Sequence, residues 1–145
     1  MRQPVSRPEG GEHSHGRRVE LRIPAGPEWV GVARLAAAGI ASRLDFSIED
    51  IEDLKLAVAE ACNCCIQNGG DGDLFIAAEL ETDRIVISVK RSGADPKAGS
   101  RTAPLDDDAE LGGLGVFLIR ALMDDVAYAS DQAGTKLTLI KRLGK

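Results

Sequence analysis

The order in which two hydrophobic periods follow one another constrains the fold of this chain more than any other feature. In some segments apolar and polar residues alternate, as they do in strands with one face on a core. In others apolar residues recur every three or four positions, as in helices that bury one side. The strand-like segments are 18–25, 74–81, 84–91, 126–130 and 135–143, and the helix-like segments are 27–44, 47–67 and a stretch that begins near Gly115.

The resulting order is β-α-α-β-β-(loop)-α-β-β. Strands and helices that segregate in this way predict an α+β fold, a two-layer sandwich with one mixed sheet of four or five strands and helices on one face. With 145 residues the chain is long enough for one domain with its own core. We expect a disordered leader over 1–17, which is rich in Pro, Gly, Arg and His, and a single domain over 18–145.

Charge and cysteine usage narrow the class of protein. The net charge of −5 disfavours a nucleic-acid-binding surface, and no apolar run approaches the length of a membrane span. Cys62, Cys64 and Cys65 lie too close together for a disulfide framework, which predicts reduced, mostly buried residues in a cytoplasmic protein. His13 and His15 could bind a metal, but two histidines in such a leader are more typical of solvated side chains.

The two long helices have predicted buried faces. On the first helix we expect one stripe to face the sheet, formed by Trp29, Val32, Leu35, Ala36, Gly39 and Ile40. On the second, which Ser47 would cap together with Asp50, the stripe is Ile51, Leu54, Val58, Ala61, Cys62 and Cys65. We expect Cys64 to point toward a would-be ligand pocket beside Glu60. Glu60 lies on a mixed side of this helix, so it could be either a solvent-exposed residue or part of a functional site.

Three glycines, Gly112, Gly113 and Gly115, stand where the third helix should begin. Glycine is a poor helix former, so the cluster is either a flexible joint or a close approach of the backbone to an anion. Free N–H groups and the positive end of the helix dipole would bind phosphate there. The polar segment 92–110 before it predicts a lid, a binding loop or a disordered insert.

Three segments carry a resemblance to a known family. In order and spacing, "EDLKLAVAEAC", "LGGLGVFLIRALMDDVAY" and "GTKLTLIKRL" resemble the anti-sigma-factor serine-protein kinases of the RsbW type. That family belongs to the GHKL superfamily of histidine-kinase-like ATPases, whose ATP-binding fold is also called the Bergerat fold. The resemblance covers about residues 18–143. It implies ATP or ADP with magnesium as cofactors, a sigma factor and a STAS-type anti-anti-sigma factor as partners, and a homodimer.

The resemblance also implies roles for single residues. Glu60 matches the base that activates the serine hydroxyl of the protein substrate. Thr135 matches a hydroxyl residue near the adenine, and 92–110 matches the ATP lid. The glycine boxes that hold the nucleotide correspond to Gly93, Gly112, Gly113, Leu114 and Gly115.

Two positions depart from the family pattern. Cys64 stands where the family has its magnesium-binding Asn, and Asn63 lies about 100° around the helix from it. A neutral thiol is a poor ligand for a cation that prefers oxygen, so the metal ligand is left unknown. Arg91 replaces the Asp that accepts the adenine amino proton, and guanidinium only donates. Either the nucleotide site has decayed and a binding module remains, or the helix repacks and binding persists weakly.

The sequence thus predicts an anti-sigma regulatory factor of the partner-switching type whose ATP-dependent serine kinase activity is weakened or lost. The alternative is a small ATP-binding sensor or enzyme of the same fold that is unrelated to sigma factors, because a fold does not fix a function. The catalytic half of a histidine kinase is disfavoured, since no dimerising helix with a phospho-accepting His is visible in the chain.

Overall fold

The structure is a computed structural model that describes residues 17–67, 72–92, 101–104, 114–131 and 134–144. Most of the expected leader, 1–16, therefore lies outside the described residues, although Arg17 already belongs to the first strand. Within the described part, none of the helices combines the length and the apolar character that crossing a bilayer requires.

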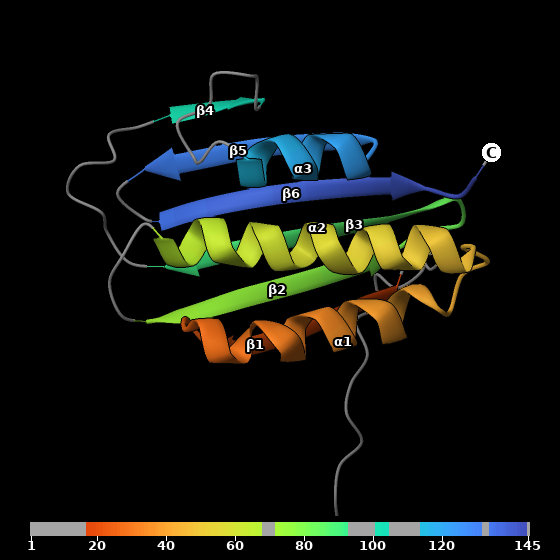
Figure 1. Cartoon of the computed structure of the whole chain (residues 1–145), viewed down its shortest axis with the longest axis horizontal. Helices are drawn as coiled ribbons and strands as arrows, with labels where there is room; N and C mark the ends of the chain where they lie inside the picture. The colour runs from red at the N-terminus through yellow and green to blue at the C-terminus, as the bar shows by residue number, and fades with distance from the viewer. Residues whose placement is uncertain (1–16, 68–71, 93–100, 105–113, 132–133, 145) are drawn as a thin grey trace, which may run out of the picture.

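Within these ranges, six strands form one sheet with the spatial order β1-β2-β3-β6-β5-β4 (Figure 1). Every neighbouring pair in it is antiparallel, so the expectation of a mixed sheet was wrong. The α+β class and the predicted order of elements are confirmed. The strands are β1 (Arg17–Pro24), β2 (Asp73–Leu80), β3 (Arg84–Ser92), β4 (Arg101–Pro104), β5 (Asp125–Asp131) and β6 (Gly134–Arg142).

The short strand β4 is the sixth strand, in a segment that we expected to be irregular. It pairs with β5 at the sheet edge, with Arg101 opposite Ser130 and Pro104 opposite Ala127. Four residues are too few to show a period of two, and the segment contains a proline, which sheets tolerate on an edge strand. Pairing with β5 is a long-range effect that the local sequence does not reveal.

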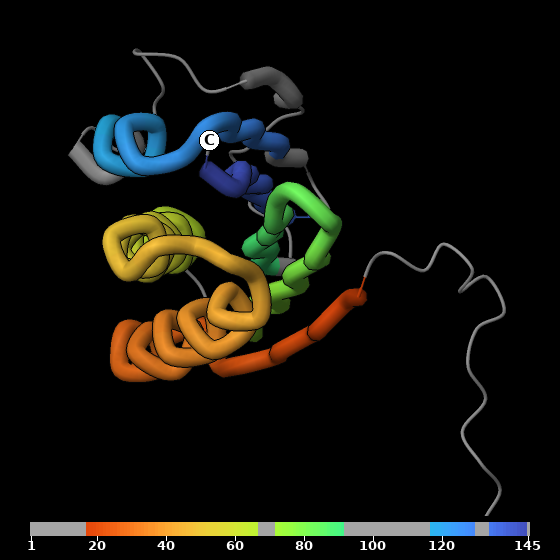
Figure 2. Tube along the Cα trace, turned by 90° about the vertical axis from the view of Figure 1, so that its right-hand side faces the viewer, coloured from red at the N-terminus to blue at the C-terminus, as the bar shows by residue number. Residues whose placement is uncertain are grey.

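Three α-helices cover one face of the sheet, as the side view in Figure 2 shows. They are α1 (Val30–Ala41), preceded by a short 3-10 turn at Pro27–Trp29, α2 (Ile48–Gln67) and α3 (Leu114–Leu122). The two-layer arrangement with helices on a single face is therefore confirmed. No helix of the described residues lies on the other face of the sheet, and we call it the open face.

The buried stripe of α1 differs from the predicted one. Val30, Ala33, Ala37 and Ala41 are buried, whereas Leu35 is 71% exposed. Trp29 and Val32 are also largely exposed, Gly39 is exposed, and Ala36 and Ile40 are half-buried. Apolar residues surround almost the whole helix, so its period selects no face. The side of α1 that carries the alanines is buried against α2, β1 and β2, because these small side chains let the helix lie close to those elements.

The second helix agrees with its prediction. The amide of Asp50 donates to Ser47 Oγ at 3.0 Å, so Ser47 caps the helix. Leu54, Val58 and Ala61 are buried on its inner side, together with Cys62 and Cys65, and Ile51 packs at the margin of the core. The core lies between this face and the inward residues of the central strands, among them Ile85, Ile87, Val89, Leu137 and Leu139.

Candidate functional site

The candidate site lies where the later half of α2 crosses the ends of β3 and β6. Arg91 and Thr135 are Cα partners in the β3–β6 ladder, so their side chains share the helix-covered face of the sheet. Both are buried, at 8% and 4% exposed. On α2, burial and then the nearby charge of Glu60 raise the pKa of Cys64; burial also raises the pKa of Cys65, and the nearby charge of Arg91 on β3 partly opposes that rise. The fold therefore gathers Glu60, Cys64, Arg91 and Thr135 into one region.

The three cysteines are free and buried, as the sequence predicts for Cys62 and Cys65. Cys64 is also buried, at 5% exposed. Its expected direction, toward a would-be nucleotide pocket beside Glu60, stays a prediction. Burial raises the pKa of Cys62 to about 12, and burial together with the charge of Glu60 raises that of Cys64 to about 11. These thiols are therefore neutral near pH 7. Cys65 lies 3.9 Å from the carbonyl oxygen of Val89, which ties α2 to β3.

The residues present do not fit a magnesium site of the family type. Magnesium prefers oxygen ligands in octahedral geometry, and the neutral, buried thiol of Cys64 stands at the position that the resemblance assigns to a magnesium-binding Asn. Asn63 is half-buried and lies about 100° around the helix, so it cannot take that place without a rotation of α2. Among the described residues, no group of three or more His, Cys, Asp or Glu side chains could hold a metal ion.

The position that the resemblance assigns to adenine recognition, Arg91 on β3, also lacks the hydrogen-bond acceptor that adenine requires. A purine amino group is a donor and requires an acceptor, but the buried side chain at this point of β3 is the guanidinium of Arg91. Thr135, its neighbour on β6, remains as a hydroxyl that can both donate and accept. The chemistry of this pair does not match adenine through the contact that the resemblance implies.

Only some of the residues that the resemblance assigns to phosphate binding belong to the described part of the chain. Gly93, Gly112 and Gly113 lie outside the described residues, while Leu114 and Gly115 form the first turn of α3. Backbone N–H groups in that turn lack helical partners, which is the feature that favours an anion. On α3, Ile119 is buried and Leu122 packs against the core, and Met123, directly after the helix, is buried as well.

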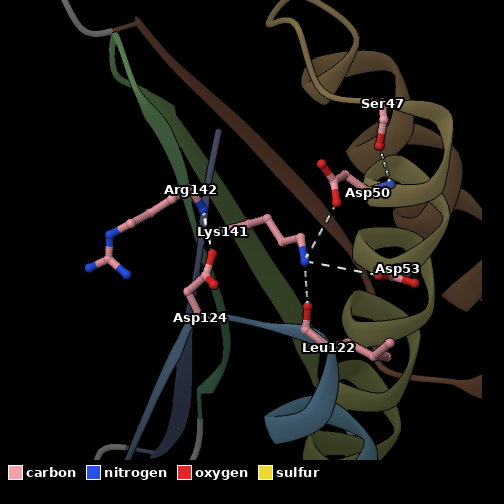
Figure 3. Close-up of polar contacts among 7 residues, drawn as sticks. All are labelled: Ser47, Asp50, Asp53, Leu122, Asp124, Lys141 and Arg142. Atoms are coloured by element: carbon pink, nitrogen blue, oxygen red, sulfur yellow. Dashed lines mark hydrogen bonds and ion pairs between the residues drawn. The ribbon is translucent and has the colours of Figure 1, made fainter. Parts of the chain in front are cut away.

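A lysine that we did not single out in the sequence holds α3 against α2. Lys141, on β6, is largely buried and donates to the carbonyl oxygen of Leu122 at 2.8 Å (Figure 3). Its Nζ also lies 3.9 Å from Asp50 Oδ1 and 4.0 Å from Asp53 Oδ2. A cation at the last turn of α3 and carboxylates in the first turns of α2 complement both helix dipoles. The contacts join three elements distant in sequence, so no local pattern predicts them.

The turn after α3 is fixed by a second set of bonds. The amide of Asp124 donates to Ile140 O at 2.9 Å, and the amide of Arg142 donates to Asp124 Oδ2 at 2.7 Å. Figure 3 shows the bond between Arg142 and Asp124 beside the Lys141 contacts. The end of α3 is therefore tied to β6 through both backbone and side chains. This fixes the direction of the helix whose first turn contains Gly115.

Comparison with known proteins agrees with this architecture. A family described as the histidine kinase-like ATPase domain matches residues 23–141. A protein of Halalkalibacterium halodurans named serine-protein kinase RsbW is 40% identical over 138 residues, which cover 86% of this chain and 83% of the relative. Proteins of the same name from Bacillus pumilus and Listeria innocua are each 35% identical and cover 88% of this chain. These alignments span 86% and 88% of the two relatives.

Proposed function

Because the chain belongs to the histidine kinase-like ATPase domain family, we propose that it is an anti-sigma regulatory factor of the partner-switching type. It binds a sigma factor in the cytoplasm and releases it when a STAS-type anti-anti-sigma factor competes. The similarity to serine-protein kinases named RsbW over most of the chain supports this function. Regulation then works through protein contacts, with weakened or absent phosphorylation.

One observation carries the binding-only form of this proposal. Cys64, buried and neutral, and Arg91, also buried, stand at the two positions that the resemblance assigns to magnesium and adenine binding. Phosphoryl transfer depends on positioned phosphates and on metal ions that neutralise their charge. In our proposal Glu60 and the glycine turn of α3 remain as the remnant of a kinase site, and Gly93, Gly112, Gly113, Leu114, Gly115 and Thr135 are its nucleotide-facing residues. The outer surface keeps the partner contacts.

The test is co-purification from the native organism with the affinity-tagged chain as bait. We expect a sigma factor in the eluate without added ATP, and we expect a STAS-domain protein to displace it. The control is the same bait carrying Leu54→Ala, whose cavity should weaken the whole fold. If no sigma factor is retained while other proteins bind specifically, the alternative of a sensor or enzyme unrelated to sigma factors would be favoured.

We further propose that the protein is a homodimer, by analogy with the family that it resembles. Light scattering coupled to gel filtration at micromolar concentration should give about twice the 15.4 kDa mass of the chain. A dilution series should show the mass falling towards that of one chain as the dimer dissociates. A mass of one chain throughout the micromolar range would remove the dimer from the proposal.

A further inference from the structure

The open face of the sheet carries a row of cations that the proposed function does not use. The row runs across four neighbouring strands and contains three cations and one aromatic ring. Arg22 on β1 lies opposite Phe75 on β2. Phe75 lies opposite Lys90 on β3, and Lys90 lies opposite Lys136 on β6. Neighbouring strands are about 4.8 Å apart, so the row spans about 14 Å across the sheet. These residues line a hollow of about 440 Å³ on the open face.

The two arginines that line the hollow have acidic partners. Arg22 Nε lies 2.9 Å from Asp73 Oδ2, and its guanidinium stands 5.8 Å from the centre of the Phe75 ring. Arg18 pairs with Glu20 and with Glu79. These contacts fix the two arginines along β1 and β2 and form one wall of the hollow.

The two lysines differ from the arginines. Lys90 and Lys136 are exposed and lie directly opposite one another, and no carboxylate of the described residues pairs with either. Like charges directly opposite in a sheet are destabilising. The chain has a net charge of −5, so an excess of cations does not account for the pair. An anion seated between the two ammonium groups would turn this repulsion into attraction.

The remaining lining of the hollow indicates what kind of anion it is. Phe75 is 38% exposed, and the small side chains of Ala77 and Ser88 also line the hollow, as does Glu20, which pairs with Arg18. Lys90 and Lys136 beside the exposed ring fit a ligand that carries both carboxylates and apolar side chains. The opposite side of the molecule has the opposite charge, since α2 begins with Glu49, Asp50, Glu52 and Asp53. An acidic ligand would therefore be attracted to the open face and repelled from the start of α2.

We propose that the open face is a docking site for an acidic, partly apolar segment of a partner protein, held by Lys90 and Lys136 over Phe75. The site lies on the face of the sheet opposite Glu60 and Cys64, so it requires no nucleotide. Carboxylates of the segment bind the lysine pair, and an apolar side chain enters the hollow against the ring. Electrostatic attraction of this kind mainly speeds association and falls as salt rises.

The test uses a short fluorescein-labelled peptide of alternating glutamate and leucine, titrated with the full chain in fluorescence anisotropy. We expect binding that weakens with salt and at least about a tenfold loss of affinity in the double variant Lys90→Gln with Lys136→Gln. Arg43→Gln is the control, because it removes one exposed charge from the loop after α1 and should leave affinity unchanged. Amide shifts on peptide binding should be confined to β1, β2, β3 and β6.

A second readout separates a docking site from a passive charged surface. Removing the repulsion should raise the melting temperature of Lys136→Gln even though the peptide binds it less well, whereas loss through misfolding would lower both. Equal affinity of the double variant and the unmodified chain would overturn the proposal. So would displacement of the peptide by inorganic phosphate alone, which would indicate a simple anion site. Protection of this face by a second copy of the chain would also overturn it.

Discussion

An ATP titration of the purified chain should give a dissociation constant weaker than about 100 μM, or no binding, with or without magnesium. Replacing the adenine acceptor by the buried guanidinium of Arg91 removes one hydrogen bond and sets donor against donor. Such a change costs about 1–3 kcal/mol, or about 5- to 150-fold in affinity. Loss of an oxygen ligand at Cys64 should add a separate penalty that appears only with magnesium present.

The restoring variant is Cys64→Asn combined with Arg91→Asp, which installs both missing groups. We expect it to gain at least about tenfold in affinity, and the gain from Cys64→Asn should require magnesium. The matched control is Cys64→Ala with Arg91→Ala, which removes the same side chains without supplying ligands. Circular dichroism checks that each variant is folded.

Tight ATP binding by the unmodified chain, together with phosphorylation of a serine on a STAS partner, would contradict the decay of the site. Asn63 would then be the first residue to test as a substitute metal ligand, since it is half-buried on the adjacent position of α2. Asn63→Ala should in that case abolish the effect of magnesium.

The largest effect on stability is expected from truncation on the covered face of the sheet. Ile87 is fully buried on β3, between Ala78 and Leu139 of the neighbouring strands, and faces the helices. Ile87→Ala should lower the free energy of unfolding by about 2–5 kcal/mol, because the removed methyl groups leave a cavity. Urea denaturation followed by circular dichroism measures this change.

The neighbouring residue supplies a matched control. Val86 lies on the same strand but points to the open face, where it is only half-buried. Val86→Ala should cost less than about 1 kcal/mol, because little packing is lost on a face without helices. Equal losses for the two variants would contradict a sheet that is covered on one face only, and would mean that the open face is itself packed in solution.

Local patterns in the sequence predicted every element that is long enough to show a period. The strands β1, β2, β3, β5 and β6 and the three α-helices were all expected within a few residues of their observed bounds. The inner face of α2 was also predictable, because polar residues such as Glu49 and Asp50 separate its apolar ones. Glu60, Arg91 and Thr135 could be singled out by the family resemblance, but their assembly into one region could not be derived from local pattern.

Tertiary structure decided the features that depend on contacts between distant segments. The inner face of α1 follows from packing, since its sequence is apolar nearly all round and its alanines allow the closest approach to the sheet. β4 forms by pairing with β5 at the edge of the sheet. The antiparallel direction of every strand pair follows from how the strands are connected. Cys64 is buried by the exact rotation of α2, and Lys141 meets Leu122, Asp50 and Asp53 only in the folded chain.

The physical reason for this division is the range of the interactions. Helix and strand periods arise from neighbours a few residues apart, so the sequence by itself determined the elements and their order. Register, helix rotation and ion pairing join residues up to about a hundred positions apart. The free energies of these long-range interactions depend on which surfaces meet in the folded chain. The pairing of β3 with β6, for example, places Arg91 beside Thr135 and Lys90 beside Lys136.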